Sequence, residues 1–539
     1  MKAGDSEHMS IKINNISLGL EEEEHELIAK AAKKLRLSQD KIQSVNILKE
    51  SVDARKKDNI RFNYSLEVMA ENEEKIVERL MDKDVLLYKA DEKEELVFGV
   101  KKLASRPVVV GMGPAGMFAA LELARNGYRP LVIERGESVE HREQSVKAFW
   151  ELGILNPESN VQFGEGGAGT FSDGKLTTRI KDCRCDHVLK EFVKAGAPAE
   201  IAYSGKPHIG TDILKVVVKN IREEIEMLGG TIMFSHRLED IKIENSRIKS
   251  IVVKGEEITC QALLLAIGHS SRDTYEMLFR KEIMLEQKPF AIGVRIEHSQ
   301  KLINESQYGK HAGHPKLKAA DYRLTHTCAD SKRAVYSFCM CPGGEVVAAA
   351  SEEGLLVTNG MSDYRRDKDN ANSAIVVSVG AEDFKSSSPL AGMEFQRNYE
   401  RLAFKAGGGN YLAPVQLTQD FLNDRISIKL GNVAPTYTPG YRFADMRECL
   451  PSCAIESLKE GLFHFDKKIK NFSDGNSVLT GIETRTSAPL RILRNQNFQS
   501  SNVAGLFPSG EGAGFAGGII SSAVDGIKSA EWIMREFSA

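Results

Sequence analysis

The segment 106–135 alternates between apolar runs and a helical pattern. Its sequence, RPVVVGMGPAGMFAALELARNGYRPLVIER, begins with an apolar, β-rich run over 108–110 and passes through a glycine-rich turn. A helical pattern rich in Ala and Leu covers 117–126, and a second apolar run covers 130–133. This order of strand, turn, helix and strand predicts a βαβ unit.

Later segments carry patterns that return the chain to this unit. Residues 262–268, ALLLAIG, form a continuous apolar run, which we expect to be a buried strand beside the first one. Near the C-terminus we expect a strand over 505–508 and a helix that starts near Gly518. Short runs at 231–234, 241–243, 248–253 and 257–260 predict a meander of strands.

Residues 10–100 carry the pattern of a separate small domain. The expected elements follow the order β-α-β-β-α-β, which is that of a ferredoxin-like module. Nothing in this range indicates catalysis, so it is either a module that contacts a partner or regulates the protein, or a packing domain. The expected strands are 10–18, 43–49, 59–68 and 85–88, and the expected helices are 21–35 and 73–81.

The pattern between residues 290 and 480 is mixed. The expected strands are 290–297, 334–339 and 346–350, and the expected helices are 397–406 and 446–463. No second GxGxxG motif occurs in this range. A chain that held two dinucleotides on two Rossmann units should show two such motifs, so we expect a substrate or cap domain here.

Composition narrows the class of protein. The chain has 539 residues, of which 42% are hydrophobic and 27% charged, as expected for about three globular domains. Its net charge of −3 includes no basic excess, so we expect no nucleic-acid partner. Apolar runs long enough to span a bilayer and a signal-peptide core are both absent from the sequence, so we expect no membrane span and a cytoplasmic location.

The eight cysteines do not indicate a disulfide scaffold. Two pairs have Cys-x-Cys spacing, Cys183 with Cys185 and Cys339 with Cys341, and two further cysteines lie four positions apart. The Cys-x2-Cys spacing typical of metal sites is absent. We therefore expect reduced structural thiols and no metal site.

The glycine-rich turn of 106–135 has the GxGxxG spacing of a dinucleotide-binding motif. Gly111 permits the sharp turn out of the strand, Gly113 lets the backbone approach a pyrophosphate, and Gly116 lets the helix pack closely on the sheet. The helix N-terminus offers free N–H groups and the positive end of its dipole to phosphates. Glu134 follows at the distance where a carboxylate meets ribose hydroxyls.

Two further glycine-rich loops are candidates for ligand contact. The loop NVQFGEGGAGTFSDGKLTT covers 160–178 and is too rich in glycine to lie inside a helix or strand, but it lets backbone amides approach a planar or anionic ligand. In the C-terminal loop, Glu511 is a candidate acceptor for ribityl hydroxyls. The helix after it is placed to face the edge of a flavin that becomes negative on reduction.

The sequence contains the motifs VVVGMGPAG with ER, FGEGGAGTFSDGKL, KPHIGTD, ALLLAIG, ETRTSAP and GLFPSGEGAGFAGGI. As a set, these motifs resemble those of the bacterial FAD-dependent dehydrogenases. This is a family of NAD(P)/FAD-dependent oxidoreductases related to geranylgeranyl reductase-type flavoproteins. The resemblance implies an α/β fold with a Rossmann-like FAD-binding domain of the glutathione-reductase type. This domain would comprise 106–290 and 481–539, with an α+β substrate or cap domain inserted at 291–480 and the ferredoxin-like α+β module at 10–100.

The resemblance also implies an FAD site. The pyrophosphate should lie on the turn 111–116, Glu134 should hold the adenosine ribose, Arg135 and Arg142 should flank the adenosine and phosphates, and the 164–175 loop should lie along the ribityl chain and the isoalloxazine. The implied residues are Gly111, Gly113, Pro114, Ala115, Gly116, Glu134, Arg135, Arg142, Gly164, Gly166, Gly167, Thr170, Lys175, Leu238, Ala266, Gly268, Glu511, Gly517, Gly518 and Ile519.

The implied activity is that of an FAD-dependent oxidoreductase that passes a hydride through flavin N5 to or from a small-molecule substrate, with NADH or NADPH as a transient electron donor. Candidates for substrate anchoring or proton transfer are Lys175, Arg485 and His326. Asp173-Gly174 is followed by Lys-Leu-Thr rather than by Ser and Arg, which disfavours an aromatic hydroxylase. Two alternatives stay open: a flavin-dependent RNA-modifying protein, and a non-catalytic flavin-binding sensor, each using the N-terminal module to contact a partner.

Overall fold

The computed structural model describes residues 9–89 and 96–539, which divide into two compact units. One unit contains the described residues up to 89 together with 198–207 and 307–318, and the other contains the remaining described residues. The two added segments fall inside the ranges expected for the FAD-binding and cap domains. Part of the range expected for the N-terminal module, 90–95, lies outside the described residues.

The N-terminal unit is built on a four-stranded sheet with the order β2-β3-β1-β4, in which every neighbouring pair is antiparallel. Strand β3 alternates buried and partly exposed side chains, so one face carries Phe62, Tyr64, Leu66 and Val68 into the core. The elements are β1 Ser10–Gly19, α1 Glu26–Leu35, β2 Ile42–Asp53, β3 Arg61–Ala70, α2 Glu73–Leu80 and β4 Val85–Tyr88.

The second unit contains a five-stranded parallel sheet with the order β24-β12-β6-β7-β8. Every residue of β6, β7 and β12 is buried, which explains why these strands are continuously apolar in the sequence. This strand order is that of a Rossmann sheet, and it reverses direction between β6 and β12. The strands are β6 Val108–Val110, β7 Leu131–Ile133, β8 Thr231–Met233, β12 Leu263–Leu265 and β24 Leu506–Pro508.

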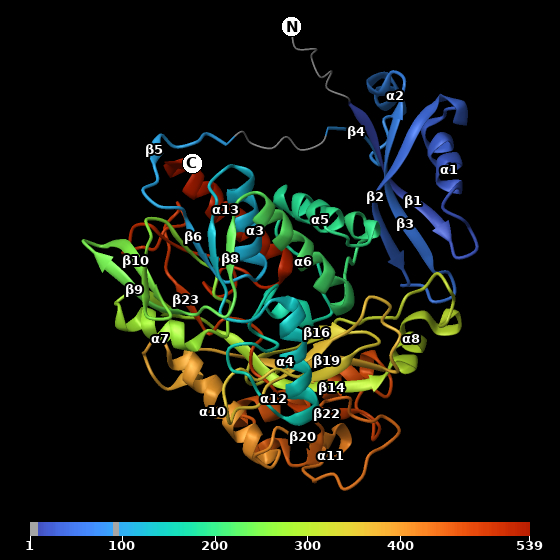
Figure 1. Ribbon diagram of the computed structural model, residues 1–539. Helices are drawn as coiled ribbons and strands as arrows, with labels where there is room; N and C mark the ends of the chain where they lie inside the picture. The colour runs from blue at the N-terminus through green and yellow to red at the C-terminus, as the bar shows by residue number, and fades with distance from the viewer. Residues whose placement is uncertain (1–8, 90–95) are drawn as a thin grey trace. The chain divides into compact units, whose positions relative to one another are not determined.

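Helices α3 (Pro114–Arg125) and α13 (Ile519–Glu536) pack against each other beside this sheet, together with α5 (Arg184–Lys194) and α6 (Thr211–Met227) (Figure 1). Helix α3, which has 12 residues, is buried on nearly every face, as its Ala- and Leu-rich sequence requires. The C-terminal helix thus completes the fold that the segment 106–135 begins.

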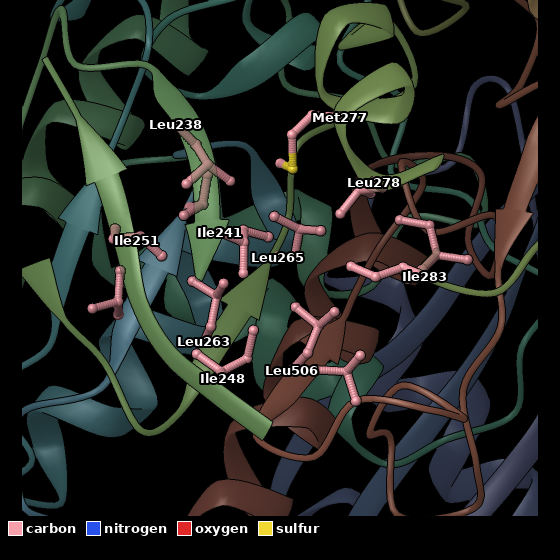
Figure 2. Close-up of a cluster of buried hydrophobic side chains, with 14 of the residues drawn as sticks. Leu238, Ile241, Ile248, Ile251, Leu263, Leu265, Met277, Leu278, Ile283 and Leu506 are labelled. Carbon is pink, nitrogen blue, oxygen red and sulfur yellow. The ribbon is translucent and has the colours of Figure 1, made fainter. Parts of the chain in front are cut away.

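An antiparallel meander of β9 (Leu238–Glu244), β10 (Arg247–Val253) and β11 (Glu256–Thr259) covers the parallel sheet. The prediction that 231–234 begins this meander is wrong, because β8 pairs with β7 in the parallel sheet. A short apolar run gives the period of a strand but not its partner. Figure 2 shows the core between the two sheets and α7 (Arg272–Arg280), which includes Leu238, Ile241, Ile248, Ile251, Leu263, Leu265 and Leu506.

A seven-stranded sheet forms the rest of this unit, with the order β15-β16-β19-β14-β22-β20-β21. Helices α10 (Ala391–Ala406) and α12 (Ser452–Lys468) pack on it. The expected strand 346–350 is β17 (Glu345–Ala348), which pairs with β18 (Thr358–Met361) in a separate ribbon. The strands of the large sheet are β14 Phe290–Ser299, β15 Thr325–Thr327, β16 Ala334–Cys341, β19 Asn370–Val379, β20 Ala413–Leu417, β21 Tyr441–Phe443 and β22 Val478–Glu483.

Shorter elements and connecting helices complete the chain. They are α4 Val139–Leu152, α8 Gln300–Tyr308, α9 Ala381–Phe384, α11 Thr418–Leu422, β5 Lys101–Lys102, β13 Leu285–Gln287, β23 Leu490–Ile492 and β25 Phe537–Ser538. Within residues 9–89 and 96–539, none of the helices combines the length and the apolar character that crossing a membrane requires.

Candidate functional site

A cavity of about 410 Å³ lies where the strand order of the parallel sheet reverses. The carboxyl ends of β6 and β12 form one wall, and the loop before α13 forms another. The seven-stranded sheet contributes a third wall. Ligands of open α/β sheets bind at such a switch point. The lining segments include 110–115, 133–135, 162–164, 167–169, 172–175, 236–238, 266–271, 338–339, 357–359, 483–486 and 517–519.

The three motif glycines differ in what surrounds them. A Cβ on Gly111, whose φ is +99°, would lie 2.2 Å from the carbonyl oxygen of Ala266, and a Cβ on Gly116 would lie 1.9 Å from that of Gly111. Gly113 has more space, because a Cβ there would come no closer than 3.7 Å to Gly167. Two glycines therefore allow close packing of strand and helix, whereas Gly113 borders the cavity.

The N-termini of two helices meet this cavity. Helix α3 begins at Pro114 and α13 begins at Ile519, and both residues line it. A Cβ added at Gly268, Gly517 or Gly518 would meet nothing within 4 Å. The backbone on these walls is thus open to a bound group, and two positive helix ends favour one that carries negative charge.

Glu134 joins three backbone segments around the cavity. Its Oε2 accepts from the Met112 amide at 2.7 Å, and its Oε1 accepts from the amides of Gly136 at 2.9 Å and Gly164 at 3.0 Å. Because each carboxylate oxygen has two acceptor positions, Oε2 retains one. The side chain is therefore able to accept a ligand hydroxyl while it also holds the loop, a second role that the sequence did not indicate.

Arg142 does not flank the cavity as expected. It is fully buried, and its guanidinium donates to the backbone carbonyls of Asn160, Val161 and Glu165 at 2.9, 3.0 and 2.6 Å. Burial lowers the pKa of Arg142 to about 10, so it keeps its charge at neutral pH. It holds the glycine-rich loop from behind.

Three other expected ligand residues also lie behind the cavity wall: Gly116, Gly166 and Thr170 are absent from its lining. The Thr170 hydroxyl donates to the Glu165 carbonyl at 3.1 Å, and a Cβ on Gly166 would lie 2.1 Å from that hydroxyl. These residues fix the shape of the loop that the lining residues present. The expected residues that line the cavity are Gly111, Gly113, Pro114, Ala115, Glu134, Arg135, Gly164, Gly167, Lys175, Leu238, Ala266, Gly268, Glu511, Gly517, Gly518 and Ile519.

Arg485 lines the cavity, but four of its five N–H donors are already engaged. It pairs with both carboxylate oxygens of Glu400, at 3.1 and 3.0 Å, and also donates to Ser270 and Ser351. Burial opposes ionisation of Glu400, yet the charges of Arg272 and Arg485 hold the pKa of this carboxyl at about 2. Arg485 is therefore a positioning residue rather than a free anchor for a substrate anion.

His326 does not reach the cavity. It lies on β15, where its Nε2 is 2.8 Å from Oε1 of Glu460 and its ring stacks on His464 with centroids 3.9 Å apart. Burial and the charge of His326 lower the pKa of His464. The structure does not bring His326 to this cavity, because the fold of the large sheet places it beside α12 instead.

Lys175 lines the cavity as a paired cation. Its Nζ lies 2.9 Å from Asp173 and donates to the carbonyl of Met340. Burial disfavours the ammonium, but the charge of Asp173 outweighs this effect and raises the pKa of Lys175. A lysine that stays protonated supplies a fixed positive charge and not a general base.

Glu511 and His269 are the lining residues whose ionisation the site changes most clearly. Burial raises the pKa of Glu511 to about 7, although the ammonium of Lys288 opposes this shift. Burial, with the charges of Arg485 and Arg272, lowers the pKa of His269 to about 3. The histidine is therefore neutral at the cavity wall, and Glu511 changes charge near neutral pH.

Cys339 is one of the lining residues that the sequence interpretation did not assign to the site. The sequence placed it in a structural thiol pair, and its Cys-x-Cys spacing with Cys341 was the only available signal. Residues Phe338 and Cys339 bring the end of β16 to the cavity.

Comparison with known proteins identifies three matching segments. Residues 105–307 match the pyridine nucleotide-disulphide oxidoreductase family, 289–486 match the FAD-dependent protein, C-terminal domain-like family, and 10–69 match a domain of unknown function. An uncharacterized protein of Clostridium beijerinckii is 61% identical over 529 residues, which is 98% of this chain and 99% of that protein.

Solved structures show weaker likeness. The glycine oxidase of Bacillus cereus is 9% identical, with a TM-score of 0.32, over 80% of this chain and 98% of its own. The flavin-dependent brominase Bmp2 is 11% identical, with a TM-score of 0.34, over 79% of this chain and 77% of its own.

Proposed function

Because the chain belongs to the bacterial family of FAD-dependent oxidoreductases, we propose that the cavity at the switch point holds FAD and that the protein is a dehydrogenase or reductase of a small molecule. The observation that carries this proposal is the convergence of two helix N-termini and open glycine backbone on one cavity. A dinucleotide with a pyrophosphate and an electron-accepting ring needs both features.

The adenosine end would lie on the β6 side of the cavity. Amides at the start of α3 would bind the pyrophosphate, and Gly113 leaves room for it. The remaining acceptor position of Glu134 Oε2 would take a ribose hydroxyl, and Leu238, which lines the cavity, would lie beside the adenine. Arg135 is fixed by Asp273, with its guanidinium 4.1 Å from the ring centroid of Phe163, so it forms a rigid wall at this end.

The flavin end would lie beneath α13. The amides of Gly518 and Ile519 would face the pyrimidine edge, and Glu511 would meet the ribityl hydroxyls. When bound, FAD supplies two-electron hydride chemistry at its N5. The protein's part is to orient the ring, to exclude water with the buried Arg485–Glu400 pair, and to hold or release a proton at Glu511.

We also propose the finer organisation that the resemblance implies. The parallel sheet and cavity would be of the glutathione-reductase type, with a substrate or cap domain at 291–480 and a ferredoxin-like module at 10–100. The β-α-β-β-α-β order and antiparallel pairing of the N-terminal unit support the last assignment. None of the eight cysteines, all within the described residues, forms a disulfide, which supports a cytoplasmic location.

An anaerobic absorbance experiment tests the proposal. The purified protein, reconstituted with FAD, should show a flavin spectrum, and FAD should be recovered after denaturation. NADH and NADPH are then added separately, and rapid bleaching by either one would establish a reductase driven by a pyridine nucleotide. Bound FAD without bleaching would point to substrate dehydrogenation or a sensor role. Failure to bind FAD after reconstitution would overturn the proposal.

A further inference from the structure

The end of strand β16 carries a bulge that holds Cys339 and Cys341. Phe338 pairs with Ala374, but Cys341 pairs with Asn372, so β16 contains one extra residue at this point. Cys339 has a φ of +44°, in the left-handed region that is uncommon for a residue with a side chain. Such bulges redirect side chains and occur next to active sites. Here the bulge accompanies a thiol at the cavity wall.

The two cysteines are in contact. The Cys341 thiol donates to the Cys339 carbonyl at 3.2 Å. A disulfide between them requires Cα atoms separated by less than about 7 Å. Residues two apart in a strand have Cα atoms about 6.6 Å apart, which is just inside that limit, so the pair meets this requirement.

Two cations are fixed on the backbone of this bulge. Arg295 donates to the Cys339 carbonyl at 2.9 Å, and Lys175 donates to that of Met340. Their own counter-ions are Glu483 and Asp173. The hydrogen bond from Cys341, with the charges of Lys175 and Arg295, lowers the pKa of the Cys339 thiol despite its burial. The cysteine that lines the cavity is thus the one that favours the reactive thiolate.

The other cysteines lack this environment. Burial raises the pKa of Cys260 and of Cys449 to about 12, and neither lines the cavity. The second Cys-x-Cys pair, at the start of α5, also lies outside it. Its Cys183 is exposed, and burial raises the pKa of Cys185. This pair has the same spacing but lies outside the cavity, where Asp182 and Asp186 oppose the charge of Lys528, so it is a control of matched spacing.

We propose that Cys339 and Cys341 form a redox-active dithiol that exchanges two electrons with the flavin, an inference that rests on the proposed function. In the oxidising direction each thiol gives up one proton and one electron, the S–S bond forms, and the flavin takes up the two electrons and two protons. The reverse reaction restores both thiols. The pair lies outside the 105–307 segment that matches the pyridine nucleotide-disulphide oxidoreductases, so that match does not assign it.

The first test needs no flavin. The full-length apoprotein is oxidised with diamide at pH 7, alkylated and mapped by mass spectrometry. We expect a Cys339–Cys341 disulfide to form at least about tenfold faster than a Cys183–Cys185 disulfide, because a lowered pKa increases the thiolate fraction. Equal rates for the two pairs, or no Cys339–Cys341 disulfide, would overturn the proposal.

The second test uses the FAD-loaded protein. Anaerobic titration of the oxidised wild type with dithionite should consume about two equivalents, one for the flavin and one for the disulfide. The variant Cys341→Ser keeps a hydroxyl donor to the Cys339 carbonyl and should consume about one equivalent. Cys183→Ser with Cys185→Ser should behave as the wild type. If the wild type with bound FAD consumes only one equivalent of dithionite, the redox-active dithiol is overturned and the proposed function is not. If the protein fails to bind FAD, both the proposed function and the electron exchange with the flavin are overturned.

Discussion

Gly526, in the C-terminal helix α13, lies directly against Ala115 in the first turn of α3. A Cβ at position 526 would be 2.0 Å from the Ala115 carbonyl oxygen. This close approach locks together two helices from opposite ends of the second unit. Both helices begin at the cavity, so their contact sets the distance between their two positive ends.

Replacing Gly526 should therefore damage the scaffold itself. The variant Gly526→Val would push α13 away from α3. We expect the free energy of unfolding to fall by about 1–3 kcal/mol, as for other overpacked cores. Urea unfolding of the apoprotein, followed by circular dichroism, measures this loss. Unchanged stability of the variant would contradict the close packing.

A substitution at Gly517 should weaken FAD binding and leave the stability of the apoprotein almost unchanged. A Cβ there would meet nothing within 4 Å, and its φ is not in the left-handed region. We expect Gly517→Val to leave the stability of the apoprotein within about 0.5 kcal/mol of wild type, as at other unrestricted positions. The same side chain would occupy space in the cavity and weaken FAD binding by at least about tenfold, or 1.4 kcal/mol. Flavin fluorescence titration measures the second effect, and FAD affinity equal to wild type would place the flavin elsewhere.

The ion pairs of Glu400 with Arg272 and Arg485 should make the free energy of unfolding depend on pH in the acid range. The pKa of Glu400 is lowered from 4.5 to about 2 in the folded state. Its stabilising contribution is therefore fully present above about pH 4.5 and is lost as the pH falls toward 2, an effect of order 3 kcal/mol. Urea unfolding at a series of pH values measures the slope of the free energy of unfolding against pH.

The variant Glu400→Gln supplies the comparison for that slope. It removes the counter-ion of the buried Arg485 and leaves the buried Arg272 with Glu352 alone, so we expect a loss of about 3–5 kcal/mol at pH 7. Its stability should also depend less on pH between 4.5 and 2. A variant as stable as wild type would show that this ion pair contributes nothing net.

Glu511 should give a pH dependence of the opposite sign. Burial raises its pKa from 4.5 to about 7, so the folded state binds the proton more tightly than the unfolded state. The associated stability is present below about pH 4.5 and is lost as the pH rises through 7. We expect Glu511→Gln to flatten the profile of melting temperature between pH 5 and 8, with Glu536→Gln as a control at a carboxylate that does not line the cavity. Parallel profiles for wild type and Glu511→Gln would contradict this assignment.

The sequence by itself identified the local parts of the fold and of the site. The strand–turn–helix at 108–125 and the strand and helix around 506–536 lie close to where their patterns predict. Gly111 and Gly116 pack as their spacing indicates, and Gly113 borders the cavity. Such features follow from residues that are near one another in the chain, because hydrophobic period and glycine spacing are local properties.

Only the tertiary structure decided which distant groups meet. Arg142 and Arg485 are both among the site residues expected from the sequence, yet their guanidinium groups are engaged by carbonyls and by Glu400 from other parts of the fold. His326 lies beside α12, and the Cys339–Cys341 pair reaches the cavity through a bulge in β16. A sequence pattern gives the period and polarity of each segment, but the partner of a buried charge or thiol depends on long-range packing that no local pattern contains.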